Sequence, residues 1–283
     1  MSTAILLISC PDRRGITASI TDFVYQNNGN IEHADQHIDA QSGTFFMRIE
    51  WSLDGFKVPA ARMPAKLSSL AKRFSMKWSF FLSDEASRVA LFVSKSTAVS
   101  QDLLLRHEAG QFRCAIPLVI SNHPDAASIA ERFGMEFFVF PKNRKNRSRV
   151  EKEELRLLRR YKIDTLVLAR YMQVLSPGFV RAFPNRIINI HHSFLPAFAG
   201  SQPYRQAFQR GVKIIGATSH YVTDRLDAGP IVEQDTVRVS HRDSLADLKQ
   251  KGEDLEKIVL SRALRWHLER KILVYNNKTV VFD

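Results

Sequence analysis

Two stretches of the sequence hold the side chains best suited to acid–base chemistry. The first, INIHHSFLP, supplies a carboxamide, two imidazoles and a hydroxyl at Asn189, His191, His192 and Ser193. The second, HYVTDRLDAGP, supplies an imidazole and two carboxylates at His220, Asp224 and Asp227. A carboxamide can donate to a developing oxyanion, an imidazole can carry a proton, and a carboxylate can orient the imidazole or accept a proton. Together these residues predict acyl-group chemistry.

Both stretches lie at the ends of apolar runs that are typical of buried strands. Residues 186–188 lead into the first stretch, and residues 214–222 lead into the second. Ligands of open α/β sheets bind in the crevice outside the carboxyl ends of the strands. We therefore expect a strand end to present the amide and imidazoles, and a turn after the second strand to bring the carboxylates to them.

Length and composition indicate a globular chain of one or two domains. The chain has 283 residues, 45% of them hydrophobic and 25% charged, which is ordinary for a soluble protein. No apolar run is long enough to cross a bilayer, and residues 4–10 are too short for a signal peptide. Cys10 and Cys114 lack metal-site spacing and suit a reducing cytoplasm, as thiols that pack like small apolar groups. We expect a cytoplasmic protein without a membrane partner.

A net charge of +12 raises the question of an anionic partner. The densest basic cluster, KNRKNRSR at 142–149, lies between an expected strand and an expected helix. It has no aromatic residues on which bases could stack, and no nucleic-acid motif surrounds it. A solvated loop is the first interpretation, contact with an anionic ligand tail the second, and nucleic acid the third. We expect no nucleic-acid partner.

Residues 3–82 have the pattern of a separate βαββαβ unit. Strands are expected at 4–9, 31–40, 44–51 and 76–82. One helix is predicted by Ile16, Ile20 and Val24 at helical spacing, and a second follows Pro59. This order is ferredoxin-like. We expect a domain at 1–83, a polar linker at 84–88 and a second domain at 89–283.

This first unit resembles an ACT domain along its whole length. In such domains small effectors, often amino acids, bind near the turn after the first strand and the helix that follows. The matching positions, which the resemblance implies as effector contacts, are Asp12, Arg13, Gly15, Ile16, Asn28 and Asn30. An alternative is that the unit only dimerises the protein. ACT-like units usually pair, so we expect a homodimer or homotetramer.

The second unit alternates strands with helices, which predicts a mainly parallel, doubly wound, Rossmann-like sheet with right-handed crossovers. Strands are expected at 89–93, 115–121, 136–140, 164–169 and 231–239, besides those that lead into the two stretches. No Gly-x-Gly-x-x-Gly follows any strand, so no dinucleotide cofactor is indicated. A long helix at 244–270 and a hairpin of 272–275 with 280–282 are expected to complete this unit.

Residues 88–283 resemble the folate-dependent formyltransferases, the fold of glycinamide ribonucleotide transformylase and methionyl-tRNA formyltransferase. The resemblance is carried by Asn-Ile-His with Ser193 and Leu195-Pro196, and by Asp224 followed by Asp227-Ala228-Gly229-Pro230. An Asn-x-His alone is a weak signal, but the two motifs together are specific. In that family the Asn, the first His and the second Asp are catalytic, which implies Asn189, His191 and Asp227 here.

Within that fold, members with an ACT-like domain in front are the formyltetrahydrofolate deformylases, and the resemblance to them covers almost the whole chain. It includes ARYM at 169–172, the paired histidines, PAF at 196–198 and GVKIIGAT at 211–218. Transformylases carry a glycine-rich phosphate loop after the first strand of this domain, whereas 93–98 reads VSKSTA. The extra C-terminal domain of the tRNA enzyme is also not seen. Water is therefore the expected acceptor.

The resemblance implies hydrolysis of 10-formyltetrahydrofolate to formate and tetrahydrofolate, with the formate feeding purine biosynthesis and balancing the one-carbon pool. Water held by Asp227 and His191 would attack the formyl carbon, and the Asn189 N–H with protonated His191 would stabilise the oxyanion. The expected substrate-binding residues are Leu168, Met172, Val174, Leu175, His192, Ser193, His220 and Asp224. Leu168 and Leu175 could equally be core, and Asp224 could secure its turn.

Three alternatives remain at this point. The histidines and carboxylates could hold a metal ion, but adjacent strand residues point to opposite faces, so no metal or other cofactor is expected. A formyltransferase acting on an amine is compatible with the basic charge and Lys95. A regulatory folate- or amino-acid-binding protein with a decayed site is the third. The complete Asn–His–Asp set favours the hydrolase over it.

Overall fold

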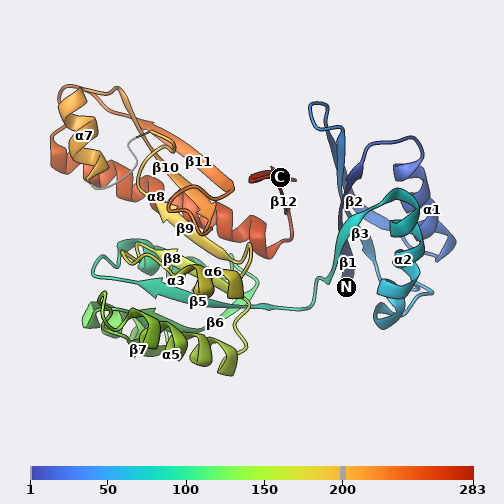
Figure 1. Ribbon diagram of the computed structural model, residues 1–283, viewed down its shortest axis with the longest axis horizontal. Helices are drawn as coiled ribbons and strands as arrows, with labels where there is room; N and C mark the ends of the chain where they lie inside the picture. The colour runs from blue at the N-terminus through green and yellow to red at the C-terminus, as the bar shows by residue number, and fades with distance from the viewer. Residues whose placement is uncertain (1, 198–201) are drawn as a thin grey trace. The chain divides into compact units, whose positions relative to one another are not determined.

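The computed structural model describes residues 2–197 and 202–283, which form two compact units (Figure 1). The first unit extends to Ala86 and also includes Glu269–Tyr275 and Val280–Asp283. The second comprises Ser87–Leu268 and Asn276–Thr279. The boundary at Ala86 falls within the linker expected from the sequence. The C-terminal segment differs from the expectation, because most of it packs with the first unit.

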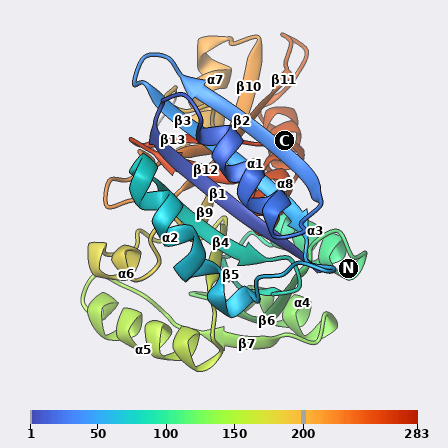
Figure 2. The ribbon, with the colours of Figure 1, turned by 90° about the vertical axis from the view of Figure 1, so that its right-hand side faces the viewer.

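The first unit is the expected ferredoxin-like arrangement. Its antiparallel sheet has the order β2-β3-β1-β4, and its strands are β1 (Thr3–Pro11), β2 (Ile31–Asp39), β3 (Thr44–Ser52) and β4 (Lys77–Leu82). The helices are α1 (Ile16–Gln26), the 3₁₀ turn η1 (Ala60–Arg62) and α2 (Met63–Phe74). Figures 1 and 2 show α1 and α2 on the same side of this sheet. The βαββαβ order is confirmed.

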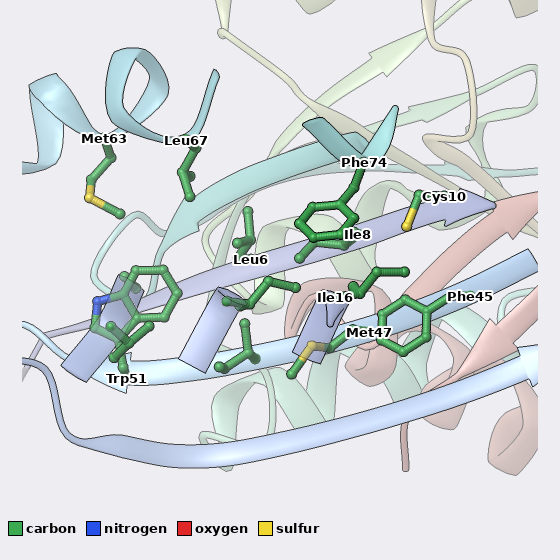
Figure 3. Packing of buried hydrophobic residues seen from close by; sticks show 14 of the residues in the cluster. Leu6, Ile8, Cys10, Ile16, Phe45, Met47, Trp51, Met63, Leu67 and Phe74 are labelled. Carbon is green, nitrogen blue, oxygen red and sulfur yellow. The ribbon is translucent and has the colours of Figure 1, made fainter. Parts of the chain in front are cut away.

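The core of the first unit follows from the two-residue period of its strands. Leu6, Ile8 and Cys10 of β1 point toward the helices and pack against Ile16 of α1 (Figure 3). Trp51 of β3 is completely buried in the same cluster. Since successive strand residues point to opposite faces, the intervening residues of β1 must be covered on the other side of the sheet.

That second face is covered by the C-terminal hairpin. Leu7 and Phe46 form a buried cluster with Phe282, which is 1% exposed. The hairpin strands are β12 (Ile272–Tyr275) and β13 (Lys278–Val281), so the second strand begins before the expected 280–282. The hairpin was expected to complete the second unit. The structure corrects this, because the apolar side chains on the outer face of β1 and β3 require a cover.

The second unit contains a seven-stranded sheet with the order β11-β10-β9-β8-β5-β6-β7. Its strands are β5 (Ser87–Val93), β6 (Cys114–Ser121), β7 (Glu136–Val139), β8 (Thr165–Ala169), β9 (Ile187–His191), β10 (Ile214–Tyr221) and β11 (Ile231–Arg238). β5 to β9 run parallel, which confirms the mainly parallel expectation. β10 pairs antiparallel with both β9 and β11.

The helices cover both faces of this sheet. They are α3 (Ala98–Glu108), η2 (Pro124–Ala126), α4 (Ala127–Arg132), α5 (Arg147–Arg160), α6 (Pro177–Ala182), α7 (Pro203–Arg210) and α8 (Leu245–Leu268). α8 lies along β9, β10 and β11 (Figure 1). α5 and α6 supply Leu158, Phe179 and Val180 to a cluster with Leu166 and Ile187 on the other face. α7 was not expected from the sequence.

The basic loop is only in part the solvated loop expected. Arg144, Lys145 and Arg149 are exposed. Lys142 instead points inward, with its Nζ 2.8 Å from Glu154 Oε2 and both side chains at most 1% exposed. A buried charge needs a partner, so this ion pair fixes the start of the loop against α5. Among the residues that the structure describes, no helix is long and apolar enough to cross a membrane.

Candidate active site

The site is built on one face of β9 and β10. Asn189 and His191 alternate along β9 and therefore point to the same side. In the antiparallel register His220 of β10 faces Asn189, and Thr218 faces His191. Four polar side chains thus share a face that, farther along the sheet, is packed against α5 and α6. The stretch at 188–196 thus places Asn189 and His191 on this face.

Asp227 reaches this face through a loop that folds back after β10. Its φ angle is 51°, in the left-handed region, and the Tyr221 N–H closes the loop by donating to the Pro230 carbonyl at 2.9 Å. A Cβ on Gly229 would clash with the Tyr221 carbonyl oxygen, so this close approach requires glycine. β10 runs opposite to β9, so the loop reaches the site by folding back and not because two carboxyl ends meet.

The Asp227 carboxylate lies beside two imidazoles. Its Oδ2 is 3.4 Å from His191 Nδ1, and its Oδ1 is 3.8 Å from His220 Nε2. The hydrogen bond from His191 lowers the pKa of Asp227, which is therefore ionised at neutral pH. The side chain remains 16% exposed, so substrate or water can reach it. This arrangement provides a carboxylate base with an imidazole held next to it.

His191 and Asn189 keep hydrogen-bonding capacity for a ligand. His191 is 6% exposed, and among the described residues its Nε2 has no hydrogen-bond partner. Asn189 is partly exposed, and its Nδ2 lies 3.2 Å from His220 Nε2. A carboxamide nitrogen carries two hydrogens, so one N–H remains after that contact. Buried polar groups are normally hydrogen-bonded, and His191 Nε2 is an exception among the described residues.

His192 belongs to a different cluster on the opposite face. Its ring lies 5.8 Å from that of Tyr204 in α7, although it is only 5.2 Å from the ring of His191. Glu256 of α8 accepts from Tyr204 Oη at 2.6 Å and from Arg170 Nε at 2.7 Å and Nη2 at 2.6 Å. Burial lowers the pKa of His192 to about 4, so its ring is neutral at pH 7.

A mostly apolar cavity of about 260 Å³ lies beside this second cluster. Its lining includes His192, Tyr204, Ala207 and Ile215. It includes neither Asn189 nor the other two expected catalytic residues. The face with Asp227 combines an ionised carboxylate with hydrogen-bonding groups that are incompletely paired among the described residues. In the described part of the chain no three His, Cys, Asp or Glu side chains converge as metal ligands.

The expected substrate-binding residues divide into three groups. Met172 and Val174 are 66% and 54% exposed. Leu168 and Leu175 are buried in the cluster shared with α5 and α6 and contribute little free surface.

The remaining expected contacts are occupied within the fold or lie apart. Ser193 is buried, and its Oγ donates to the Ala197 carbonyl at 2.9 Å. Asp224 is exposed, and its Oδ2 lies 3.4 Å from Arg181 Nη1 of α6, outside the Asp227 cluster. The C-terminal residue of the PAF motif, Phe198, lies outside the described residues.

The expected effector residues lie at the two ends of α1. Asp12 and Arg13 are exposed, and Gly15 precedes the helix with a φ of 89°. Ile16 is buried in the core of the first unit, 2% exposed, and cannot contact a ligand from outside. Asn28 and Asn30 are exposed beyond the other end, where Asn28 Nδ2 donates to the Gly55 carbonyl at 2.9 Å. The helix has 11 residues and spans about 16 Å.

Several residues that support the site were not expected. Thr218 Oγ1 accepts from the Leu195 N–H at 3.0 Å and donates to the Ser193 carbonyl at 2.8 Å, and Gln234 Nε2 donates to it at 2.9 Å. The sequence carried one usable signal for Glu256. This carboxylate falls on the same side of α8 as Leu248, Gly252 and Val259, where only apolar or small residues are expected.

Comparison with known protein families assigns both parts of the chain. Residues 87–264 match the Formyl transferase model, and residues 4–50 match the ACT domain model. The formyltetrahydrofolate deformylase of Synechocystis sp. is 55% identical over 280 residues, which cover 99% of this chain and 98% of that protein. That of Bacillus subtilis is 48% identical, covering 98% of this chain and 93% of that protein.

Solved structures give the same picture. A formyltetrahydrofolate deformylase from Pseudomonas syringae has a TM-score of 0.97 and 46% identity, covering all of this chain and 95% of that one. Glycinamide ribonucleotide transformylase 1 from Symbiobacterium toebii has a TM-score of 0.65 and 30% identity, covering 70% of this chain and 95% of that one. The full-length similarity thus includes both units, whereas the transformylase covers only part of the chain.

Proposed function

Since the chain belongs to the formyltetrahydrofolate deformylase family, it is a hydrolase of formyltetrahydrofolate, and we infer that Asn189, His191 and Asp227 carry the reaction. The observation that supports this assignment is the carboxylate of Asp227 at 3.4 Å from His191 Nδ1, on the sheet face that also presents Asn189. A base, a proton carrier and an oxyanion donor are the groups that amide hydrolysis needs.

The reaction follows from these groups. Asp227 takes a proton from a water molecule, whose oxygen bonds to the formyl carbon of 10-formyltetrahydrofolate. The formyl oxygen becomes an oxyanion and accepts a hydrogen bond from the free N–H of Asn189. Protonated His191 delivers a proton to the folate nitrogen, the carbon–nitrogen bond breaks, and tetrahydrofolate leaves with formic acid, which ionises to formate. The proton that Asp227 took from water then returns to His191. A placed proton-transfer group contributes roughly 10²–10⁴-fold to such a rate.

Met172 and Val174 form the direct apolar contact with the folate ring in this proposal. Both are exposed although apolar, and Met172 is held at its backbone N–H by Ser94 Oγ at 3.1 Å. Leu168 and Leu175 support that surface from the core. Exposed apolar side chains suit contact with a flat aromatic ligand.

Water is the acceptor in this proposal, and the alternative is transfer of the formyl group to an amine. Ser94 Oγ donates to Asn122 Oδ1 at 2.6 Å and is 4% exposed. A buried, hydrogen-bonded side chain thus occupies the position at which transformylases have glycine. A phosphate-bearing acceptor finds fewer free backbone N–H groups there.

The first unit is proposed to bind a small effector, as ACT domains do. Asp12 and Arg13 at one end of α1 are the charged groups that an amino acid would engage. Asn28 and Asn30 lie at the other end, so a ligand that contacts both groups requires a second copy of the unit. This arrangement supports the proposal of a homo-oligomer.

The formate produced is proposed to enter purine biosynthesis, and the location to be the cytoplasm. Support for the location comes from the two cysteines, both of which are free thiols.

The experiment that tests the function measures formate and tetrahydrofolate after incubation with 10-formyltetrahydrofolate, with a chelator and without an amine. Equal amounts of both products are expected. Release that depends on an added amine would favour the transferase instead. Loss of release on chelation would contradict a mechanism based on the three side chains alone.

A further inference from the structure

The hydrogen bonds of His220 define which of its ring nitrogens carries the proton. Nδ1 lies 3.0 Å from the Tyr221 carbonyl oxygen, and Nε2 lies 3.2 Å from Asn189 Nδ2. A carbonyl oxygen only accepts hydrogen bonds, so Nδ1 must be the protonated nitrogen. In a neutral imidazole the other nitrogen then has a lone pair. Nε2 of His220 is therefore an acceptor.

The surroundings of His220 keep the ring neutral. The side chain is 2% exposed, and burial lowers its pKa. The charged and titratable groups that face it are Asp227, with Oδ1 at 3.8 Å from Nε2, and His191. Both belong to the proposed site, whereas His220 itself is paired at both nitrogens. Its hydrogen-bonding pattern is that of a fixed support and not of a proton carrier.

We propose that His220 is a positioning residue that sets the orientation of the Asn189 carboxamide, an inference that rests on the proposed function. Nε2 accepts a hydrogen bond from one N–H of Asn189. This contact places the carboxamide nitrogen in the site and leaves the second N–H of that nitrogen for the formyl oxygen. A flipped amide would put its oxygen against the Nε2 lone pair and would present an acceptor to the oxyanion. His220 thus acts on the reaction only through Asn189.

This role limits the size of the effect. Removing one oxyanion donor typically costs about 10²–10³ in kcat, which we expect for Asn189→Ala. His220→Ala removes only the group that orients the donor. The net contribution of one hydrogen bond between neutral groups corresponds to roughly a tenfold change in rate. The loss should appear in kcat with KM nearly unchanged, because the interaction with the oxyanion exists only in the transition state.

The test is a double-mutant cycle on formate release with 10-formyltetrahydrofolate. His220→Ala should lower kcat about tenfold in the wild-type background and less than about twofold in the Asn189→Ala background, because coupled residues are not additive. His220→Gln should restore most of the rate, since its side-chain oxygen accepts a hydrogen bond. A loss of equal size in both backgrounds overturns the proposal.

His267 provides the matched control. It is also a buried histidine with both ring nitrogens paired, to Thr165 Oγ1 at 3.0 Å and to Tyr221 Oη at 2.8 Å, but it does not contact Asn189. His267→Gln should leave kcat unchanged in the folded protein. If it lowers kcat as much as His220→Ala does, general damage to the fold explains both and the proposal fails.

Two further measurements separate the remaining explanations. If the effect of His220→Ala disappears in an Asp227→Asn background but persists in Asn189→Ala, His220 acts through Asp227 and the proposal is overturned. Full activity of Asn189→Ala would overturn the proposed oxyanion donor together with this inference. If the His220 variants do not fold, ¹⁵N-histidine spectra of the wild-type protein decide. The Nδ1–H tautomer is expected, and the Nε2–H tautomer would exclude an acceptor facing Asn189.

Discussion

Two clusters of polar side chains lie on opposite faces of the sheet at the end of β9, and they differ in how completely they are paired. On one face, His191 Nε2 has no partner in the described part of the chain, and Asp227 is 16% exposed. On the other, Glu256 is 1% exposed and accepts from Arg170 Nε at 2.7 Å and from Tyr204 Oη at 2.6 Å.

In our proposal, the first cluster carries out the reaction and the second stabilises the fold. A buried charge with all its hydrogen bonds made is fixed in one state, whereas an incompletely paired group retains capacity for a substrate. The adjacent residues His191 and His192 have different partners: His191 Nδ1 lies 3.4 Å from Asp227 Oδ2, and the ring of His192 lies 5.8 Å from that of Tyr204.

The largest effect is expected on kcat, when the carboxylate of Asp227 is removed from the incompletely paired cluster. Asp227→Asn keeps the shape of the side chain but cannot take a proton from water. We expect kcat to fall by about 10²–10⁴-fold while folate binding persists. Rate measurements with a titration of folate binding check this. Near-wild-type turnover would exclude Asp227 as the base.

The next largest effect is expected on stability, when the fully paired cluster around Glu256 is disrupted. Glu256→Ala leaves the half-buried Arg170 without its partner, and breaking a buried ion pair costs about 3–5 kcal/mol. Asp254→Ala on the same helix is the matched control, since its 2.8 Å pair with Lys257 is exposed and should be worth less than about 1 kcal/mol. Urea unfolding of both variants measures the difference. Equal losses would contradict the distinction between the clusters.

A smaller effect is expected on the stability of the protein at acidic pH. The pKa of Asp227 is lowered by the hydrogen bond from His191, from an ordinary value of 3.8. A carboxyl group with a lowered folded-state pKa adds stability above its unfolded pKa and loses it as the pH falls through the folded pKa. The stability difference between wild type and Asp227→Asn should therefore be constant above about pH 5 and shrink below about pH 4. Unfolding curves across that range test the direction, and a difference that widens in acid would reverse the sign.

The smallest effect is expected at His192. Its ring is neutral at pH 7, since burial lowers its pKa to about 4, and it faces Tyr204. His192→Asn should change kcat by less than about tenfold, below the range for a proton-transfer group. A loss as large as that of Asp227→Asn would place His192 in the reaction and remove the distinction between the two faces.

Much of this organisation could be read from the sequence. The hydrophobic patterns located most elements of both units, though not α7, and Asn189, His191 and Asp227 lie close together. The direction of β10 could not be predicted from the sequence, and this direction places His220 opposite Asn189. Strand direction follows from long-range packing, and no local pattern reports it.

Other differences have the same origin. Leu168 and Met172 are both apolar and only four positions apart, yet one is 4% exposed and the other 66%. Their difference arises where the chain leaves β8 through Arg170, whose φ angle of 57° turns the backbone. A residue type does not reveal such a turn. Lys142, in a run of solvated cations, is likewise buried because Glu154 lies on the neighbouring helix.

The hairpin that covers Leu7 and Phe46 is synthesised long after the rest of the first unit. Residues 3–82 leave the ribosome before the second unit, but the strands that cover the outer face of their sheet follow almost all of that unit. Domains generally begin to fold as they emerge, at about 5–20 residues per second. For roughly ten seconds or longer at that rate, the nascent first unit therefore has an uncovered apolar sheet face. The hairpin, which is made after almost all of the second unit, completes the first unit.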